Sequence, residues 1–70
     1  MADVRSEMVA NVWKVVVKAG DQVSAGDPLV ILESMKMEIP VEAPQDGTVQ
    51  KVAVEEGGVV QEGDLIASIA

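Results

Sequence analysis

Cysteine and histidine are both absent from the 70 residues of this chain. Without cysteine, the chain can form neither a disulfide nor a thiolate metal site. Without histidine, it lacks the most frequent general base and the most frequent metal ligand. Nucleophilic triads of the usual kind are therefore excluded, and the sequence predicts a protein that is not an enzyme. Trp13 is the only aromatic residue, and we expect it to pack against its own sheet.

Basic residues are also few. Five Lys and Arg stand against twelve Asp and Glu, for a net charge of -7 at pH 7. Such a surface repels nucleic acid and anionic membranes. No apolar run approaches the ~20 residues of a membrane helix, and no basic and apolar leader of the secretory type is present. We expect a cytoplasmic monomer with no nucleic-acid or membrane partner.

Valine is abundant, and its positions repeat. When residues 1–33 are aligned with residues 38–70, a shift of 37 positions, nine of the 33 pairs are identical. The identities fall on glycines and alternating valines, which is typical of a duplicated unit. The pattern predicts two similar halves, approximately residues 4–33 and 41–70. The identical pairs are Val4/Val41, Val12/Val49, Lys14/Lys51, Val15/Val52, Val17/Val54, Gly20/Gly57, Val23/Val60, Gly26/Gly63 and Asp27/Asp64.

Each half contains the same turn signals. Glycine permits positive φ at corners, and Asp side chains hydrogen-bond the turn backbone. Turns this frequent leave no room for a 10-residue helix, so a phenylalanine-free, valine-rich chain favours strands. Inward valines three residues apart, Val12 to Val15 and Val49 to Val52, predict a bulge in each half with Lys14 or Lys51 facing water. We therefore expect eight short strands in two small antiparallel sheets that face each other.

The two halves meet at residues 33–38, with Lys36 near the centre. Apolar strands on both sides, residues 29–32 and 39–41, predict a tight hairpin whose tip carries Lys36. Because the halves are similar, this tip should stand at one end of the domain with both termini at the other. Lys36 is the only base between Lys18 and Lys51.

The chemistry of this hairpin is unusual. Met35 and Met37 flank the lysine where Gly, Asn or Asp would be the usual turn formers. Exposed methionines have no folding rationale, and methionine surfaces are adaptable in recognition. An activated catalytic lysine would need burial or a neighbouring cation, whereas the charges near Lys36 are Glu33, Glu38 and Glu42. Although most surface lysines are only solubilising charges, this one fits a substrate for another enzyme.

The run Glu33-Ser34-Met35-Lys36-Met37-Glu38 resembles the biotinylation motif of the biotinyl/lipoyl attachment domain family, whose core is Met-Lys-Met. The resemblance covers almost the whole chain, including Gly20-Asp21, Gly26-Asp27 and the closing Gly63-Asp64-Leu65-Ile66. It is strongest to free-standing biotin/lipoyl attachment proteins of the biotin carboxyl carrier type. The implied fold is an all-β flattened barrel or sandwich, a barrel-sandwich hybrid of two four-stranded antiparallel sheets with quasi-twofold symmetry. Residues 1–70 would form one carrier domain.

The resemblance also implies a function. A biotin protein ligase would join biotin to Lys36, reading Glu33, Ser34, Met35, Met37 and Glu38, and the two methionines would pack beside the biotin ring. Lys36 would then carry carboxybiotin between biotin carboxylase and carboxyltransferase subunits or domains. One segment departs from the family pattern Ala-Pro-Met-x-Gly, since residues 6–10 read Ser-Glu-Met-Val-Ala, whereas the second half keeps Ala43-Pro44 and Gly47.

Two alternatives remain open. A lipoyl carrier, or a dual biotin and lipoate acceptor, would have the same fold and use the same lysine, but lipoyl domains typically show Asp-Lys-Ala at the hairpin. A small β interaction module with an unmodified lysine would need a patch elsewhere on the surface, and the sequence offers only dispersed acids with Trp13 as one candidate member. No metal ligands are predicted.

Overall fold

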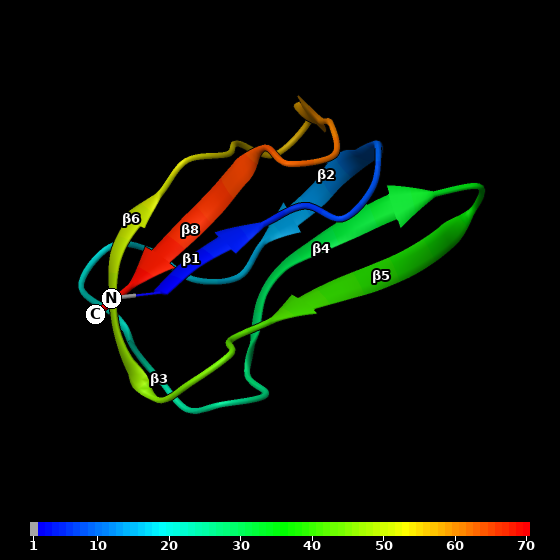
Figure 1. Cartoon of the computed structure of the whole chain (residues 1–70). Coiled ribbons are helices and arrows are strands. Elements are labelled where there is room, and N and C mark those ends of the chain that lie inside the picture. The colour runs from blue at the N-terminus through cyan, green and yellow to red at the C-terminus, as the bar shows by residue number, and fades with distance from the viewer. Residues whose placement is uncertain (1) are drawn as a thin grey trace.

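The computed structural model describes residues 2–70, which fold into eight strands without a helix (Figure 1). Two four-stranded antiparallel sheets form, with the strand orders β1-β8-β6-β3 and β5-β4-β2-β7. The predicted all-β sandwich of two four-stranded sheets is confirmed. The strands are β1 (Ala2–Arg5), β2 (Ala10–Val15), β3 (Gln22–Val23), β4 (Pro28–Ser34), β5 (Met37–Glu42), β6 (Gly47–Val52), β7 (Val59–Val60) and β8 (Leu65–Ile69).

The two sheets are related by the quasi-twofold symmetry that the sequence repeat predicts. A shift of 37 positions carries β2 onto β6, β3 onto β7, and β4 onto β8, while β1 falls on the second part of β5. Under the same shift the strand order of one sheet becomes that of the other. We call the sheet that contains β4 and β5 the hairpin sheet and the other sheet the terminal sheet.

Both predicted bulges are present. The pairing of β2 with β4 shifts register between Val12 and Lys14, and that of β6 with β8 shifts between Val49 and Lys51. Each bulge lets two valines three residues apart face the core while two successive residues face water. Lys14 and Lys51 are exposed as expected. Strand β2 ends at Val15, and Val17 beyond it still packs against the core.

The corners between strands are closed by aspartate side chains. Asp21, Asp27 and Asp64 each accept a hydrogen bond from the backbone N–H three residues earlier, at 3.0, 2.9 and 2.9 Å. The glycine before each aspartate has a φ near +90°, a conformation that a side chain disfavours. The fourth corner has Gly58 where the others have Asp, and keeps only the backbone hydrogen bond to the Glu55 carbonyl at 3.0 Å.

The segment after β1 departs from the family pattern but makes the same turn. Ser6 donates its N–H to the Asp64 carbonyl and accepts from Gly63, at 2.9 and 2.8 Å. In the other half, Ala43 makes the matching bonds to Asp27 and Gly26. The buried Ser6 hydroxyl donates to the Met8 carbonyl at 2.6 Å. The two halves thus make the same turn in different ways. The first half closes it with a side-chain hydrogen bond, and the second half has Pro44 there.

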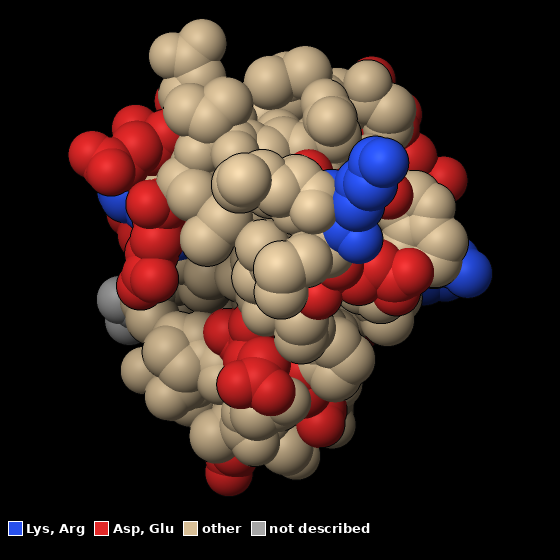
Figure 2. Space-filling model, turned by 90° about the vertical axis from the view of Figure 1, so that its right-hand side faces the viewer, with Lys and Arg blue, Asp and Glu red and all other residues tan. Residues whose placement is uncertain are grey.

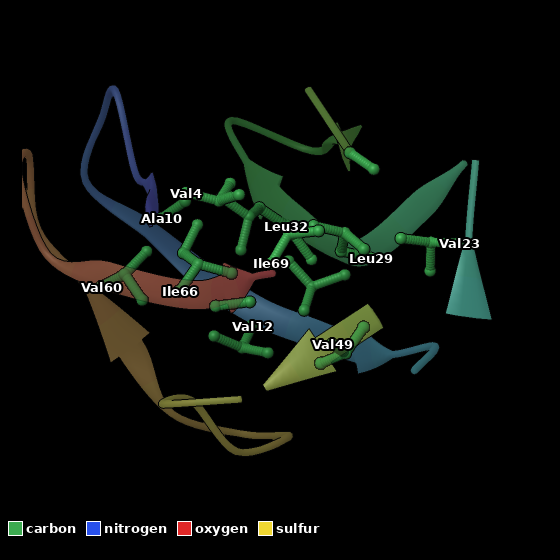
Figure 3. Close-up of a cluster of buried hydrophobic side chains, with 13 residues drawn as sticks. Val4, Ala10, Val12, Val23, Leu29, Leu32, Val49, Val60, Ile66 and Ile69 are labelled. Atoms are coloured by element: carbon green, nitrogen blue, oxygen red, sulfur yellow. The ribbon is translucent and has the colours of Figure 1, made fainter. Parts of the chain in front are cut away.

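The core lies between the two sheets (Figure 3). Both sheets contribute to it, for example Val12 and Leu32 from one and Val49 and Ile69 from the other. Burying each such side chain contributes about 1.5–3 kcal/mol against the entropy of ordering the chain. The β4–β5 hairpin extends beyond this core at one end, while the start of β1 and the end of β8 lie side by side at the other (Figure 1). No helix long and apolar enough to cross a membrane is found in residues 2–70.

Candidate attachment site

The hairpin at the junction of the two halves has a two-residue loop. Glu33 is the register partner of Glu38, and Ser34 is the partner of Met37. Only Met35 and Lys36 lie between the strands, so four of the six residues expected around the tip are strand residues. The strands extend past the apolar stretches because backbone pairing continues where side chains have already left the core. Lys36 occupies the tip, as predicted.

The backbone of this loop is strained. Met35 has a φ of 53° and Lys36 a φ of 64°, the only non-glycine residues with positive φ in the described chain. A two-residue hairpin of type I′ requires positive φ at both central positions, which normally selects Asn-Gly. Left-handed backbone costs a residue with a side chain roughly 1–2 kcal/mol. Such strain concentrates at functional sites.

The side chains at the tip are open to solvent. Met35 is 91% exposed and Met37 65% exposed, and Lys36 is also exposed. Within residues 2–70 the ion pair formed is Arg5–Asp3 at 3.6 Å, and Lys36 takes part in none. Figure 2 faces this end of the molecule, where uncharged surface fills the upper middle of the view, a basic side chain stands to its right, and acidic groups lie below it and on both sides. The amine at the tip is therefore free to react with, or be joined to, an external group.

Two carboxylates lie at the base of the turn. Glu33 and Glu38 are exposed, directly opposite each other in the antiparallel register, and neither forms an ion pair in the described part of the chain. Like charges directly opposite are destabilising in a sheet. This pair gives the surface beside Lys36 a negative charge that no cation within residues 2–70 balances by direct contact.

A groove of about 410 Å³ lies farther along the hairpin, between the two edge strands β1 and β5. Its apolar lining includes Val4, Met8, Leu32 and Ile39, and no residue of 33–38 lines it. The predicted site residues thus share one projecting hairpin and lie outside this groove. An arrangement of this kind can present a group to another protein.

Comparison with known proteins places this hairpin in context. The sequence pattern of the Biotin_lipoyl family, described as a biotin-requiring enzyme, matches residues 1–69. This chain belongs to that family. It is 62% identical to the biotinylated protein TB7.3 homolog of Mycobacterium leprae, over 97% of this chain and 96% of the relative. It is 50% identical to the biotin/lipoyl attachment protein of Bacillus subtilis, over 91% of this chain and 88% of the relative.

A solved structure supports the fold. The crystal structure of the Kluyveromyces lactis urea carboxylase matches with a TM-score of 0.92 and 40% identity, over 99% of this chain and 6% of that one. The resemblance expected from the sequence is confirmed, and so is the expectation of biotin as the covalently bound cofactor. The chain is a biotin carrier domain. Lys36 is exposed on the projecting turn of this domain and forms no ion pair within residues 2–70.

Trp13 lies on β2, outside the attachment hairpin. Trp13 is 50% exposed on the outside of the hairpin sheet, with the Lys14 amine 6.0 Å from its ring centroid. It was expected to pack against its own sheet, and the bulge at this position leaves half of its surface open. The repeat could have indicated that Trp13 is exposed, because the residue that matches it in the second half is Gln50, which is polar.

Proposed function

We propose that Lys36 is the residue to which biotin is covalently attached, and that residues 1–70 act as one carrier domain. The observation that carries this proposal is the exposure of a single lysine on a strained two-residue turn, flanked by two exposed methionines. Strain and exposed apolar side chains both oppose stability, so their presence together at one place points to function.

The attachment reaction needs an external enzyme. The Lys36 amine, after loss of a proton to a base of the biotin protein ligase, attacks the carboxyl carbon of biotinyl adenylate. A C–N amide bond forms and the bond from that carbon to the phosphate oxygen breaks, so AMP leaves with the electron pair. The nitrogen gives up its second proton to the ligase base or to water, which leaves the neutral amide. Lys36 has no activating neighbour of its own, since the nearest side-chain charges along the hairpin are the carboxylates of Glu33 and Glu38. The ligase therefore supplies the activation, and the carrier itself catalyses nothing.

The residues around Lys36 have separate roles in this proposal. Met35 and Met37 offer flexible apolar surface to the ligase and to the ring of the attached cofactor. Ser34, Glu33 and Glu38 give the ligase polar groups by which to recognise the turn. The attached biotin accepts and releases carboxylate, so the partners after attachment are biotin carboxylase and carboxyltransferase subunits or domains. Tethering at one end of a rigid domain raises the effective concentration of the cofactor near both.

The experiment is attachment in vitro, followed by intact mass. The purified chain is incubated with a biotin protein ligase, biotin and ATP. We expect the mass gain of one biotin on the unmodified sequence and none on Lys36→Arg, with Lys14→Arg as the matched control that is still modified. Both lysines are exposed, but only Lys36 lies on the turn. Modification of the Lys36→Arg protein would refute the site.

The lipoyl alternative is tested in the same format with a lipoate ligase. The methionines favour biotin, and the double variant Met35→Asp/Met37→Ala gives the turn the Asp-Lys-Ala sequence typical of lipoyl domains. We expect that variant to lose biotinylation by at least tenfold in kcat/KM. A mass gain on the unmodified sequence with lipoate ligase alone would overturn the assignment of biotin to Lys36.

A further inference from the structure

The outer faces of the two sheets differ although their strands are equivalent. On the hairpin sheet, Lys14, Ile31 and Pro40 lie in one cross-strand row, and Asn11 and Val59 lie in the next. On the terminal sheet the matching rows are Lys51, Ser68 and Asp3, then Thr48 and Gln22. Four matched positions are apolar on the hairpin sheet and polar on the terminal sheet: Trp13/Gln50, Ile31/Ser68, Pro40/Asp3 and Val59/Gln22.

These four residues, which we call the apolar face, point away from the core. Ile31 lies between the buried Val30 and Leu32, and Pro40 lies between Ile39 and Val41, which pack inward. Trp13 is 50% exposed and Val59 63% exposed. The terminal sheet has the same backbone with polar groups at these positions, so the fold does not require the apolar ones. A surface that gives up stability in water for no structural need marks an interaction site.

The charge beside the apolar face indicates what kind of partner covers it. Glu33 and Glu38 lie in the row next to Ile31 and Pro40, on the side toward Lys36, and face the same way. Two copies of this chain, each with a net charge of -7, would bring acids toward acids across such a contact. A protein with an apolar centre bordered by Lys or Arg would instead neutralise this repelling pair.

The small size of the hairpin tip indicates whether the ligase or a later user of the cofactor needs the apolar face. A stable protein–protein contact buries about 800 Å² on each partner, from about 20–30 residues. The six residues 33–38 cannot provide that area. A ligase meets Lys36 before modification, so the lysine side chain alone must reach its active site and the ligase must lie against the strands behind the turn. A protein that acts on the attached biotin is reached by a longer arm, the lysine side chain plus biotin, and so does not have to lie against these strands.

We propose that the apolar face is the docking surface for the biotin protein ligase that modifies Lys36. The inference rests on the proposed function and adds to it a second contact area, on strands β2, β4, β5 and β7, behind the recognised turn. Docking there provides affinity, and the turn provides the reacting amine. The ligase surface that fits is an apolar patch with basic side chains opposite Glu33 and Glu38.

The test replaces residues of the apolar face by those of the other half. The triple variant Trp13→Gln/Ile31→Ser/Val59→Gln is compared with the unmodified sequence in initial rates of biotin incorporation, using purified biotin protein ligase, ATP, biotin and varied carrier concentration. We expect KM for the carrier to rise at least tenfold while kcat stays within twofold. Gln22→Ala/Gln50→Ala on the terminal sheet is the matched control, with KM unchanged. If Ile31→Ser prevents folding, Trp13→Gln/Val59→Gln at exposed positions is used instead, with an expected rise of at least threefold.

The possible results separate the two proposals. No incorporation into the unmodified sequence would contradict the proposed function itself. Incorporation with the same KM in the folded variants would overturn the docking surface alone. Two further outcomes also overturn it: self-association of the unmodified sequence that Trp13→Gln abolishes, or a variant that keeps its ligase KM but, once biotinylated, is used less well by a biotin carboxylase.

Discussion

Ser34 and Met37 are register partners across β4 and β5, and this pairing forces Met35 and Lys36 into left-handed backbone. One pairing therefore accounts for both the projection of Lys36 and the strain of its loop. A longer loop would release the strain but would let the lysine move. The short loop fixes the direction in which the amine leaves the domain, which matters when the reacting group must meet the active site of another protein.

The strain of this turn is testable by giving it the residues that its backbone prefers. The double variant Met35→Asn/Lys36→Gly places Asn-Gly in a type I′ turn. We expect the free energy of unfolding to rise by about 1–2 kcal/mol, since left-handed backbone is no longer occupied by long side chains. For a domain of this size each kcal/mol raises Tm by about 4–8 °C. Thermal unfolding followed by circular dichroism measures it.

Met35→Leu serves as the control for that measurement. It keeps a long side chain in left-handed backbone at a 91% exposed position, so its stability should stay within about 0.5 kcal/mol of the unmodified sequence. A double variant with a lower Tm than the unmodified sequence would mean that the turn stores no strain.

The opposed carboxylates of Glu33 and Glu38 lead to a second prediction. Glu38→Lys converts a like-charge cross-strand pair into an opposite-charge pair, which should raise stability by about 0.2–1 kcal/mol at low salt. The gain should fall strongly in 1 M NaCl, where the Debye length is about 3 Å. Glu42→Lys is the control, because it changes the net charge equally but residue 42 has Pro28 as its partner across the strands. Urea unfolding that gives both variants the same gain would show that net charge, and not the pair, is responsible.

Much of this architecture could be predicted from the sequence because the repeat constrains it. Valines three residues apart in both halves, such as Val12 and Val15, predicted the bulges, since only a bulge turns both inward. The glycine–aspartate pairs predicted the corners for an equally local reason. The position of Lys36 at the tip followed from its place between the halves.

Other features depend on tertiary context that one sequence does not contain. The strands continue to Ser34 and from Met37 because backbone pairing needs no apolar side chain. The turn at Ser6 is kept by a hydroxyl hydrogen bond, which the family pattern of Ala and Pro does not anticipate. Trp13 is exposed because the bulge turns two successive residues, Trp13 and Lys14, toward water. The alternation of a regular strand does not predict two outward residues in a row.

The repeat also predicts a stabilising substitution at the one corner without an aspartate. Gly58 matches Asp21, and the two residues make equivalent backbone bonds, to Val12 and Val49, both at 2.8 Å. Gly58→Asp would supply a carboxylate to the Glu55 N–H, as Asp21 supplies one to Lys18 at 3.0 Å. We expect a gain of about 1 kcal/mol from this hydrogen bond and from the reduced freedom of the unfolded chain. Gly58→Ala lacks the carboxylate but shares the effect on the unfolded chain and the close approach of the new Cβ to the Glu55 carbonyl oxygen, at 3.1 Å. Urea unfolding of both therefore isolates the carboxylate, and equal stabilities would contradict a role for it.

Gly47 and Ala10 occupy matching positions but have different room around them. A Cβ at Gly47 would overlap the Ala70 carbonyl oxygen and lie 2.8 Å from Cγ2 of Ile69. Gly47→Ala should therefore lower the free energy of unfolding by about 1–3 kcal/mol, the usual range for overpacking. Ala10→Gly removes a methyl group that is accommodated in the core, and should lower it by only about 0.5–1 kcal/mol through chain entropy. The two are compared by urea unfolding at neutral pH. If Gly47→Ala is the milder change, the last residue of the chain yields to the new methyl group, and the contact between β6 and Ala70 is looser than its paired hydrogen bonds with Thr48 indicate.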